Sequence, residues 1–396
     1  MDKVRYNLVK TVQQAHGVTL LAPVTGDTPA DAIEHVRGVC EELVAVNVTP
    51  VCRNQSKQVR SFLTRWLRAI FLRAPIYVTS SYSETLALAV RNLCSERTFD
   101  VLQATSDVTG CYLPQAGSSC ITVVGPMDDT VESVRGDIVF SRSLKHKAGR
   151  WLEYRARKHY QPRMCRAADW CLFHAPEDMR RIAELSGGLP NARTLPVAVE
   201  PADDCGDPGE ERSELEDNSV AFVGGMGSFF NVDAALHFCR DILPLIRESI
   251  PNVHVYLVGQ NPPVEIKALV DPGRITVTGA VPDVRPFVRR AAAFVAPIRV
   301  GTGVKTKTIE ALSLGKAIVT TDAGIHGLWD KGDGDMLVRN DAAGFAEAVT
   351  GLLRDRVKRE SLEGRARGLF ERSYRFEKVV PLTLGVYDEI ERGIGG

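Results

Sequence analysis

The sequence predicts an α/β protein of two domains, each built on a parallel sheet. A chain of 396 residues is too long for one ordinary hydrophobic core, which favours two domains. Short apolar, β-branched segments alternate with helical patterns from end to end, as is typical of parallel sheets covered by helices. Residues 202–218 are acidic, contain glycine and proline and hold few apolar residues, which predicts a linker between domains 1–201 and 219–375.

The elements of the first domain are read from apolar runs and helical spacing. Strands are predicted at 18–22, 100–103, 120–124 and 170–174, and helices at 61–72 and 85–93. The second domain has strands predicted at 220–223, 254–258, 275–278, 293–296 and 317–320. Asn231 is the predicted N-cap of a helix that runs to about Glu248. Residues 376–396 contain a last helix, over 376–392, that can pack back on the first domain.

Composition excludes several classes of protein. Lys+Arg and Asp+Glu balance at 49 each, which argues against a general nucleic-acid binder. Nine cysteines without metal-ligand spacing indicate reduced thiols and no metal site, as expected of a cytoplasmic protein. No apolar run approaches the ~18–20 residues that span a bilayer, and the polar N-terminus has no signal-peptide core, so any membrane contact is predicted to be peripheral.

The segment 297–324 is the most informative part of the sequence. A strand ends near Ala296, a glycine-rich loop with basic residues follows, and a helix that carries Glu310 is predicted to begin near Lys305. Ligands of open α/β sheets lie beyond the carboxyl ends of strands, where glycines, helix N–H groups and lysines suit a diphosphate. Glu310 can accept hydrogen bonds from ribose hydroxyls. The alternative is an ordinary turn with solvated lysines and a surface glutamate.

This segment resembles the donor-site signature of the group-1 glycosyltransferases. The matching positions are Gly301, Gly303, Lys305, Lys307, Glu310–Ala311, Gly315–Lys316 and 318–319, with upstream matches at 222–224, 231–233, 258–259, 278–279, 281–284 and Pro297. The resemblance covers residues 220–375 in order. It implies the GT-B fold, in which two Rossmann-like domains with parallel sheets face a central cleft. The donor is then a nucleoside-diphosphate sugar on the C-terminal domain, and many members are retaining enzymes that need no metal or other cofactor.

The resemblance also implies roles for single residues. Gly303 and Lys305 would hold the pyrophosphate with support from Lys307, Glu310 would hold the ribose, and the loop at Val281 would flank the base. The turn that starts at Gly224 and the glycine at Gly301 belong to the same predicted site.

Two positions depart from the family pattern. Thr302 stands where many members carry a glutamate that touches the donor sugar, and residues 225–230 lack the usual arginine and lysine. Arg299 either compensates for them or is an ordinary loop arginine. His326, in a loop after a strand, either contacts the donor or is structural.

Catalytic candidates in the first domain are fewer. Asp128 and Asp129 follow the strand 120–124, where a carboxylate can orient or deprotonate an acceptor hydroxyl, although an N-cap role is favoured. His174 ends a strand at the lip of the same expected cleft, where a lone histidine is more often structural. The family's first strand and acceptor loop would precede Met1, so the start is either late or truncated.

Two basic stretches suggest contact with an anionic membrane surface. Residues 61–72 place Trp66 and other apolar side chains on one helical face amid arginines, which is typical of an interfacial helix and also of a core-facing one. Residues 142–166 form a second basic stretch, for acidic lipids or a diphosphate-linked acceptor, unless it is only a charged helix.

These observations predict a glycosyltransferase that is cytoplasmic or peripheral at the inner face of the membrane. It would move a sugar from a nucleotide sugar to a glycan, a lipid-linked or a small-molecule acceptor, in the assembly of cell-surface polysaccharide or glycoconjugate. A GT-B nucleotide-sugar epimerase and an inactive nucleotide-sugar-binding module are the alternatives. A dehydrogenase is disfavoured because no strand is followed by GxGxxG.

Overall fold

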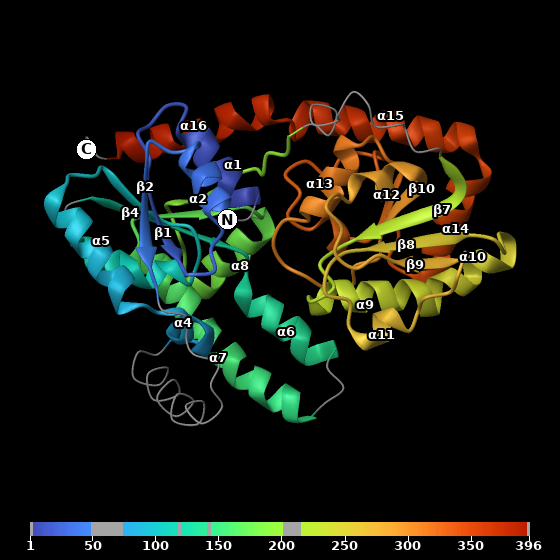
Figure 1. Ribbon diagram of the computed structural model, residues 1–396, viewed down its shortest axis with the longest axis horizontal. Helices are drawn as coiled ribbons and strands as arrows, with labels where there is room; N and C mark the ends of the chain where they lie inside the picture. Colours follow the sequence, from blue (N-terminus) through green and yellow to red (C-terminus); the bar gives the residue numbers. More distant parts are fainter. Residues whose placement is uncertain (1–2, 49–73, 118–119, 141–143, 201–214, 394–396) are drawn as a thin grey trace. The chain divides into compact units, whose positions relative to one another are not determined.

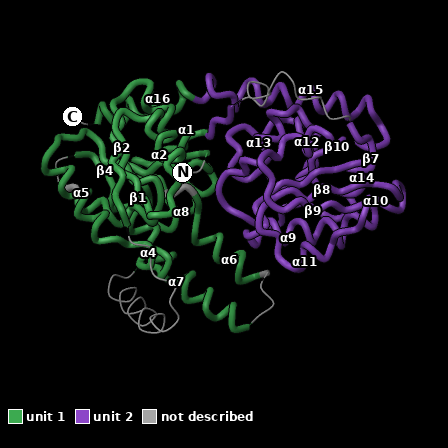
Figure 2. The backbone as a smooth tube through the Cα atoms, viewed as in Figure 1, with its two compact units in different colours: residues 1–196, 380–396 green, residues 197–379 purple. Residues whose placement is uncertain are grey.

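The chain divides into two compact units. The computed structural model describes residues 3–48, 74–117, 120–140, 144–200 and 215–393 (Figure 1). Unit 1 comprises residues 1–196 and 380–396, and unit 2 comprises residues 197–379 (Figure 2). The unit boundary therefore lies a few residues before the predicted linker.

Unit 2 contains a six-stranded parallel sheet in the order β12-β11-β10-β7-β8-β9. Its strands are β7 (Glu216–Val223), β8 (His254–Val258), β9 (Ile275–Val277), β10 (Ala291–Ala296), β11 (Ile318–Thr320) and β12 (Leu337–Val338). All six residues of β10 are buried, as expected of a strand covered by helices on both faces. Five of these strands were predicted from their apolar runs, and the two-residue β12 was not.

The start of β7 corrects the linker prediction. Residues 216–218 belong to this strand and not to the linker. Their acidic side chains have partners within unit 2: Asp217 Oδ1 lies 2.7 Å from Arg359 Nη2, and Glu216 Oε1 accepts a hydrogen bond from the Tyr256 hydroxyl at 2.9 Å. Polar composition alone therefore misplaced the boundary, because these charges are satisfied by tertiary contacts.

The helices of unit 2 cover its sheet. They are α9 (Phe229–His237), a π-helical turn (Phe238–Ile242), α10 (Leu243–Ser249), α11 (Val264–Lys267), α12 (Arg285–Arg290), α13 (Thr306–Ser313), the 3-10 turn η3 (Ala323–Ile325), α14 (Ala342–Arg354) and α15 (Arg356–Ser373). The predicted N-cap at Asn231 is wrong, because α9 begins after Ser228 and Asn231 lies in its first turn. The helix predicted over 231–248 is also interrupted by the π turn.

Unit 1 contains two small parallel sheets. β1 (Thr19–Val24) pairs with β2 (Glu42–Asn47), and a second sheet has the order β3 (Val101–Ala104), β4 (Ile121–Met127), β5 (Trp170–Phe173), β6 (Ala192–Thr194). Its helices are α1 (Lys3–Val12), α2 (Ala30–Arg37), α4 (Ile76–Ser81), α5 (Glu84–Glu96), the 3-10 helix η1 (Thr109–Ala116), α6 (Thr130–Phe140), α7 (Leu144–Ala167) and α8 (Pro176–Ser186). β2 and β6 were not predicted, and the predicted helix 61–72 lies outside the described residues.

The last helix, α16 (Phe376–Arg392), has the bounds that the sequence predicts, and from residue 380 it belongs to unit 1. Tyr387 and Ile390 join Val123 and Leu172 in one apolar cluster, and the Tyr387 hydroxyl donates to Gln103 Oε1 at 2.6 Å. Among the described residues, no helix combines the length and the apolar character that crossing a bilayer requires.

Candidate functional site

The candidate donor site lies where the chain order of the unit 2 sheet reverses. β7 and β10 are neighbours, while the chain runs outward from β7 to β8 and β9 on one side and from β10 to β11 and β12 on the other. In an open parallel sheet the loops after two such strands diverge and leave a crevice at their carboxyl ends, which is where ligands bind. The loops in question are 224–228 after β7 and 297–305 after β10.

The turn after β7 is held close to the loop after β8. The Gly224 N–H donates to the Val258 carbonyl and the Met226 N–H to the Gln260 carbonyl, each at 2.9 Å. Gly259 has φ +154°, and a Cβ added there would lie 1.9 Å from the Gly224 carbonyl oxygen. Only glycine fits at this position, so the close approach of the two loops is a fixed feature of the crevice.

The loop after β10 depends on two glycines and a lysine. Gly301 and Gly303 have φ of +153° and +71°, which favours glycine at both positions. The Lys305 side chain is only 8% exposed, and its ammonium donates to the Thr302 carbonyl at 2.8 Å and the Gly303 carbonyl at 3.0 Å. Lys305, predicted as a phosphate ligand, therefore contacts the backbone of its own loop.

Lys307 connects the two loops. It lies in the first turn of α13, its ammonium donates to Asn231 Oδ1, and it sits 4.8 Å from the centre of the Phe222 ring. The Asn231 amide in turn donates to the Gly225 carbonyl at 2.9 Å. Burial, assisted by the charge of Lys305 and opposed by Glu310, lowers the pKa of Lys307 to about 7. The site thus contains a lysine that titrates near neutral pH, and Asn231 is a site residue that sequence reasoning had assigned to capping.

The loop after β11 packs against the loop after β10. Thr308 Oγ1 donates to the Gly324 carbonyl at 3.0 Å, and a Cβ on Gly327 would lie 2.9 Å from the Gly303 carbonyl oxygen. His326, between these glycines, is partly buried at the end of η3. The structure therefore brings the loop of His326 together with the predicted diphosphate loop.

The remaining predicted donor residues lie on three different parts of unit 2. Arg299 Nε lies 3.0 Å from Asp233 Oδ2 on α9, and this carboxylate raises the pKa of the arginine, so its guanidinium links the β10 loop to α9. Glu310 is partly buried on α13. Val281 follows β9, the outermost strand on one side of the sheet, and so lies at the carboxyl ends of the strands. β8 stands between β9 and β7.

In unit 1, Asp129 caps α6. Its Oδ1 accepts from the Glu132 N–H at 2.9 Å, and its side chain is fully buried near Arg181. Burial, together with the nearby Asp178 and Glu132, raises the pKa of Asp129 to about 6 although the Glu132 N–H and Arg181 lower it. The capping interpretation is thus the one the geometry supports.

Asp128 is exposed, and its carbonyl accepts from Gln161 Nε2 at 2.8 Å. His174 is buried, with Nδ1 3.1 Å from the Leu195 carbonyl, which is typical of a structural histidine.

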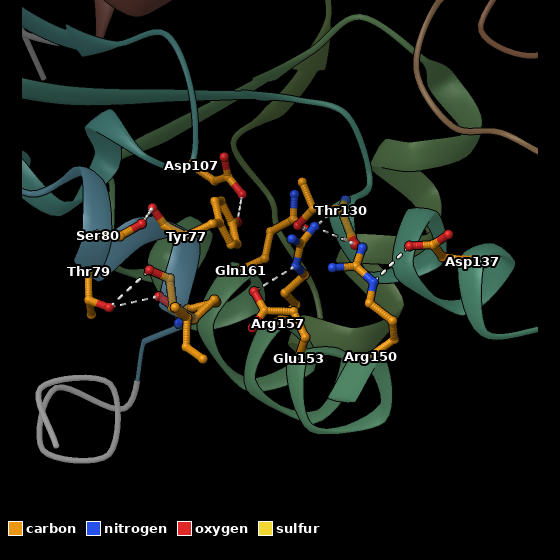
Figure 3. A network of polar contacts seen from close by, with 12 residues as sticks. Tyr77, Thr79, Ser80, Asp107, Thr130, Asp137, Arg150, Glu153, Arg157 and Gln161 are labelled. Atoms are coloured by element: carbon orange, nitrogen blue, oxygen red, sulfur yellow. Dashed lines mark hydrogen bonds and ion pairs between the residues drawn. The ribbon is translucent and has the colours of Figure 1, made fainter. Parts of the chain in front are cut away.

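Sequence reasoning missed a buried polar network at the carboxyl ends of β3 and β4 (Figure 3). The Tyr77 hydroxyl donates to Asp107 Oδ2, and the Tyr160 hydroxyl donates to the Asp107 carbonyl at 3.0 Å. The Arg157 guanidinium lies 4.1 Å from the centre of the Tyr77 ring. Burial raises the pKa of Asp107, which is 5% exposed, against the opposing hydrogen bond from Tyr77. The one available signal was an aspartate four residues after a predicted strand.

A cavity of about 1390 Å³ in unit 1 shares Tyr160 with this network. Its lining includes Asp100, Cys120 and Asp169, which stand immediately before β3, β4 and β5. It therefore reaches the amino ends of the strands, whereas sites in parallel sheets lie at the carboxyl ends. In the described part of the chain, no cluster of three or more metal-ligating side chains is present.

Comparison with known proteins agrees with this geometry. Residues 217–355 match the family model of the group 1 glycosyl transferases. No curated protein sequence matches the chain.

Several solved structures share its fold over three quarters of the chain or more. HepE from Anabaena in complex with UDP and glucose has a TM-score of 0.65 and 10% identity, over 98% of this chain and 96% of that chain. Sucrose-phosphate synthase from Thermosynechococcus elongatus has a TM-score of 0.69 and 15% identity, over 98% and 92%. TarM from S. aureus in complex with Fondaparinux, alpha-GlcNAc-glycerol and UDP has a TM-score of 0.58 and 12% identity, over 77% and 59%.

The crevice in unit 2 is thus part of a group 1 glycosyltransferase domain, and the two parallel-sheet units form a GT-B fold. The part of the chain that the family model covers, residues 217–355, is therefore a glycosyltransferase domain.

Proposed function

We propose that the enzyme binds a nucleoside-diphosphate sugar at the carboxyl ends of β7 and β10 and transfers the sugar to an acceptor hydroxyl. The observation that carries this proposal is the position of Lys307. A half-buried lysine with a pKa of about 7 lies in the first turn of a helix, between two glycine loops, at the point where the sheet order reverses. A diphosphate would supply the negative charge that such a lysine lacks.

The proposed roles follow from these contacts. The diphosphate lies against the backbone of 301–303 and the ammonium of Lys307, which oppose the charge that develops as the glycosidic bond breaks. Lys305 positions that loop through the Thr302 and Gly303 carbonyls. Glu310 accepts hydrogen bonds from the ribose. No metal or other cofactor is part of this proposal.

We also propose roles for the remaining donor-site residues. Val281 flanks the base, and His326 and Thr302 face the sugar. Arg299 acts through Asp233, holding α9 against the β10 loop. Uridine is the base to test first, because HepE was solved with UDP and with UDP-glucose.

The proposed acceptor is a glycan or a lipid-linked sugar, in the assembly of polysaccharide or glycoconjugate. TarM, crystallised with Fondaparinux and alpha-GlcNAc-glycerol, supports a glycan acceptor. Asp128 is exposed after β4 and is the better placed of the two aspartates to meet an acceptor hydroxyl, since Asp129 is buried. We place the enzyme in the cytoplasm at the membrane surface. The sequence-predicted docking helix 61–72 lies outside the described residues, and exchange of Arg65 and Arg68 for Glu tests it.

Calorimetry on the full chain with UDP and with uridine tests the donor assignment. A charge-assisted hydrogen bond contributes about 1.5–3 kcal/mol, so Glu310→Gln should weaken both ligands about tenfold to a hundredfold. Lys307→Met should weaken UDP and spare uridine, because Lys307 is assigned to phosphate. Glu347→Gln, an exposed change on α14, is the matched control and should bind like wild type. Unchanged UDP binding by both Glu310→Gln and Lys307→Met would refute the site. Turnover of UDP-glucose to an isomer without acceptor would favour an epimerase.

A further inference from the structure

The amino-terminal two thirds of α7 contribute little to the core of unit 1, although Tyr154 is partly buried against an apolar cluster there. All the buried residues of this 24-residue helix fall at or after Tyr160, so residues 144–159 bury no side chain fully. This part packs along α6, and Asp137 on α6 lies 2.7 Å from Arg150 Nε (Figure 3). Figure 1 shows α6 and the beginning of α7 extending beyond the sheet of unit 1.

The exposed face of this part of α7 carries large apolar side chains. Leu144 is 83% exposed and Trp151 is 48% exposed, and Leu152 beside Trp151 is also exposed. Residues 144, 148 and 151 follow the spacing that places them on one side of a helix. Val139, near the end of α6, adds a further exposed apolar side chain. Scattered apolar residues are normal on a surface, but a Leu and a Trp on one helical face mark an interaction surface.

The same face is strongly basic. α7 holds eight lysines and arginines against the single carboxylate of Glu153. Arg150 pairs with Asp137. Arg157 Nε lies 3.4 Å from Glu153 Oε1, and its guanidinium stacks on the Tyr77 ring, so both arginines face inward. Their neighbours Lys145, Arg155 and Lys158 are exposed.

Trp151 has a cation beside its ring. The Arg155 guanidinium carbon lies 5.0 Å from the centre of the indole. An indole flanked by a guanidinium, with leucines beside it, suits the headgroup layer of a bilayer, where rings meet the acyl boundary and cations meet phosphate. Nucleic acid would satisfy the charges but offer no partner to Leu144 and Leu152.

We propose that residues 144–158 of α7 form a docking surface for an anionic membrane, in which Leu144 and Trp151 enter the interface and Lys145, Arg155 and Lys158 meet lipid phosphates. This inference rests on the membrane part of the proposed function and names a surface for it. It is independent of the donor site.

The test is sedimentation of the full chain with phosphatidylglycerol vesicles. A basic residue near an anionic surface contributes about fivefold to partitioning. Leu144→Ser with Lys145→Glu inverts one charge and removes one apolar anchor, so vesicle binding should fall at least about 25-fold. The matched control is Val357→Ser with Lys358→Glu on α15, where Val357 is 77% exposed and the lysine follows it in the same way. This control should bind like wild type.

Each outcome decides the proposal. Absence of wild-type binding to these vesicles overturns it, as does equal binding by the two double variants. If only the Arg65→Glu, Arg68→Glu chain loses binding, the membrane location stands through residues 61–72 and the α7 surface is wrong. Tighter binding to a DNA oligonucleotide than to vesicles, lost in Leu144→Ser with Lys145→Glu, assigns the surface to nucleic acid instead. UDP binding by the same proteins reports on the donor site separately, and it should be unchanged.

Discussion

Lys307 should take up a proton when a nucleoside diphosphate binds. Burial and the charge of Lys305 lower the pKa of Lys307 from 10.5 to about 7. A diphosphate beside the ammonium favours its charged form and so raises this pKa again. At about pH 8 the unliganded lysine is only about 10% protonated, so binding of UDP should take up about 0.9 proton. The affinity for UDP should then fall about tenfold per pH unit above about pH 7, because protonation becomes part of binding.

Calorimetry in two buffers of different ionisation enthalpy measures this uptake directly. It is best done above about pH 7, where the terminal phosphate, with a second pKa of about 6, is already ionised. Lys307→Met should abolish the uptake and flatten the pH dependence of the affinity. Lys316→Met is the matched control, because burial lowers the pKa of Lys316 too, but Lys316 lies before β11, at the opposite end of the strand from the crevice.

Two results would refute the reasoning. UDP binding at about pH 8 without proton uptake by wild type would mean that the diphosphate does not meet Lys307. Persistence of the uptake in Lys307→Met would assign the proton to another group. Loss of uptake in Lys316→Met as well would indicate a general change in the unit rather than a contact with phosphate.

Two further predictions concern stability. Gly259→Ala should destabilise the protein by about 2–4 kcal/mol in thermal or urea unfolding, because its Cβ would meet the Gly224 carbonyl. Gly225→Ala, with nothing within 4 Å of the added Cβ, should be close to neutral, and equal losses in both would contradict the close-approach argument. Asp129→Ala should be about 1 kcal/mol less stable than Asp129→Asn, because Ala loses the acceptor that caps α6 and Asn keeps one. The folded-state pKa of Asp129 is raised to about 6, so its charge costs stability above about pH 6 and no longer does so below about pH 4. Asp129→Asn should therefore be more stable than wild type at neutral pH, with the gap closing between those pH values; an Asn variant that is less stable at pH 7 would contradict the pKa shift.

The sheet of unit 2 could be predicted because its strands are covered on both faces. β8, β10 and residues 220–223 of β7 are nearly continuous apolar runs bounded by glycine or polar residues, and such runs stand out in the sequence. β12 has two residues and β6 has three, and both lie at sheet edges. A strand that pairs on one side and is short carries almost no pattern, so these elements exist through tertiary pairing and not through local sequence.

The conformation of the loop after β10, the proposed diphosphate loop, was predictable for a different reason. Gly301 and Gly303 mark backbone conformations that other residues avoid, and a basic helix start beside them indicates an anion site. The partners of its charged side chains were not predictable. Lys307 meets Asn231, 76 residues earlier, and Arg299 meets Asp233, 66 residues earlier. Spacing within a motif says nothing about contacts of this kind.

The same limit explains why the polar network of unit 1 was not predicted. Tyr77, Asp107 and Arg157 come from three separate elements that the fold brings together at the ends of β3 and β4. No segment of the sequence contains more than one of them. Asp129, by contrast, acts within four residues of itself as a cap, and local sequence was sufficient to raise that interpretation.

The contrast between Lys305 and Lys307 is central to the chemistry that we propose for this site. The Lys305 ammonium donates hydrogen bonds to the Thr302 and Gly303 carbonyls, and these bonds hold the loop in the left-handed conformation that Gly303 permits. That fixed positive charge stands close to Lys307 and helps to lower its pKa. Lys307 is therefore poised to gain a full charge when an anion arrives, and Asn231 holds it against the turn after β7 meanwhile. A site built in this way favours the state in which negative charge is greatest, which in sugar transfer is the departing nucleoside diphosphate.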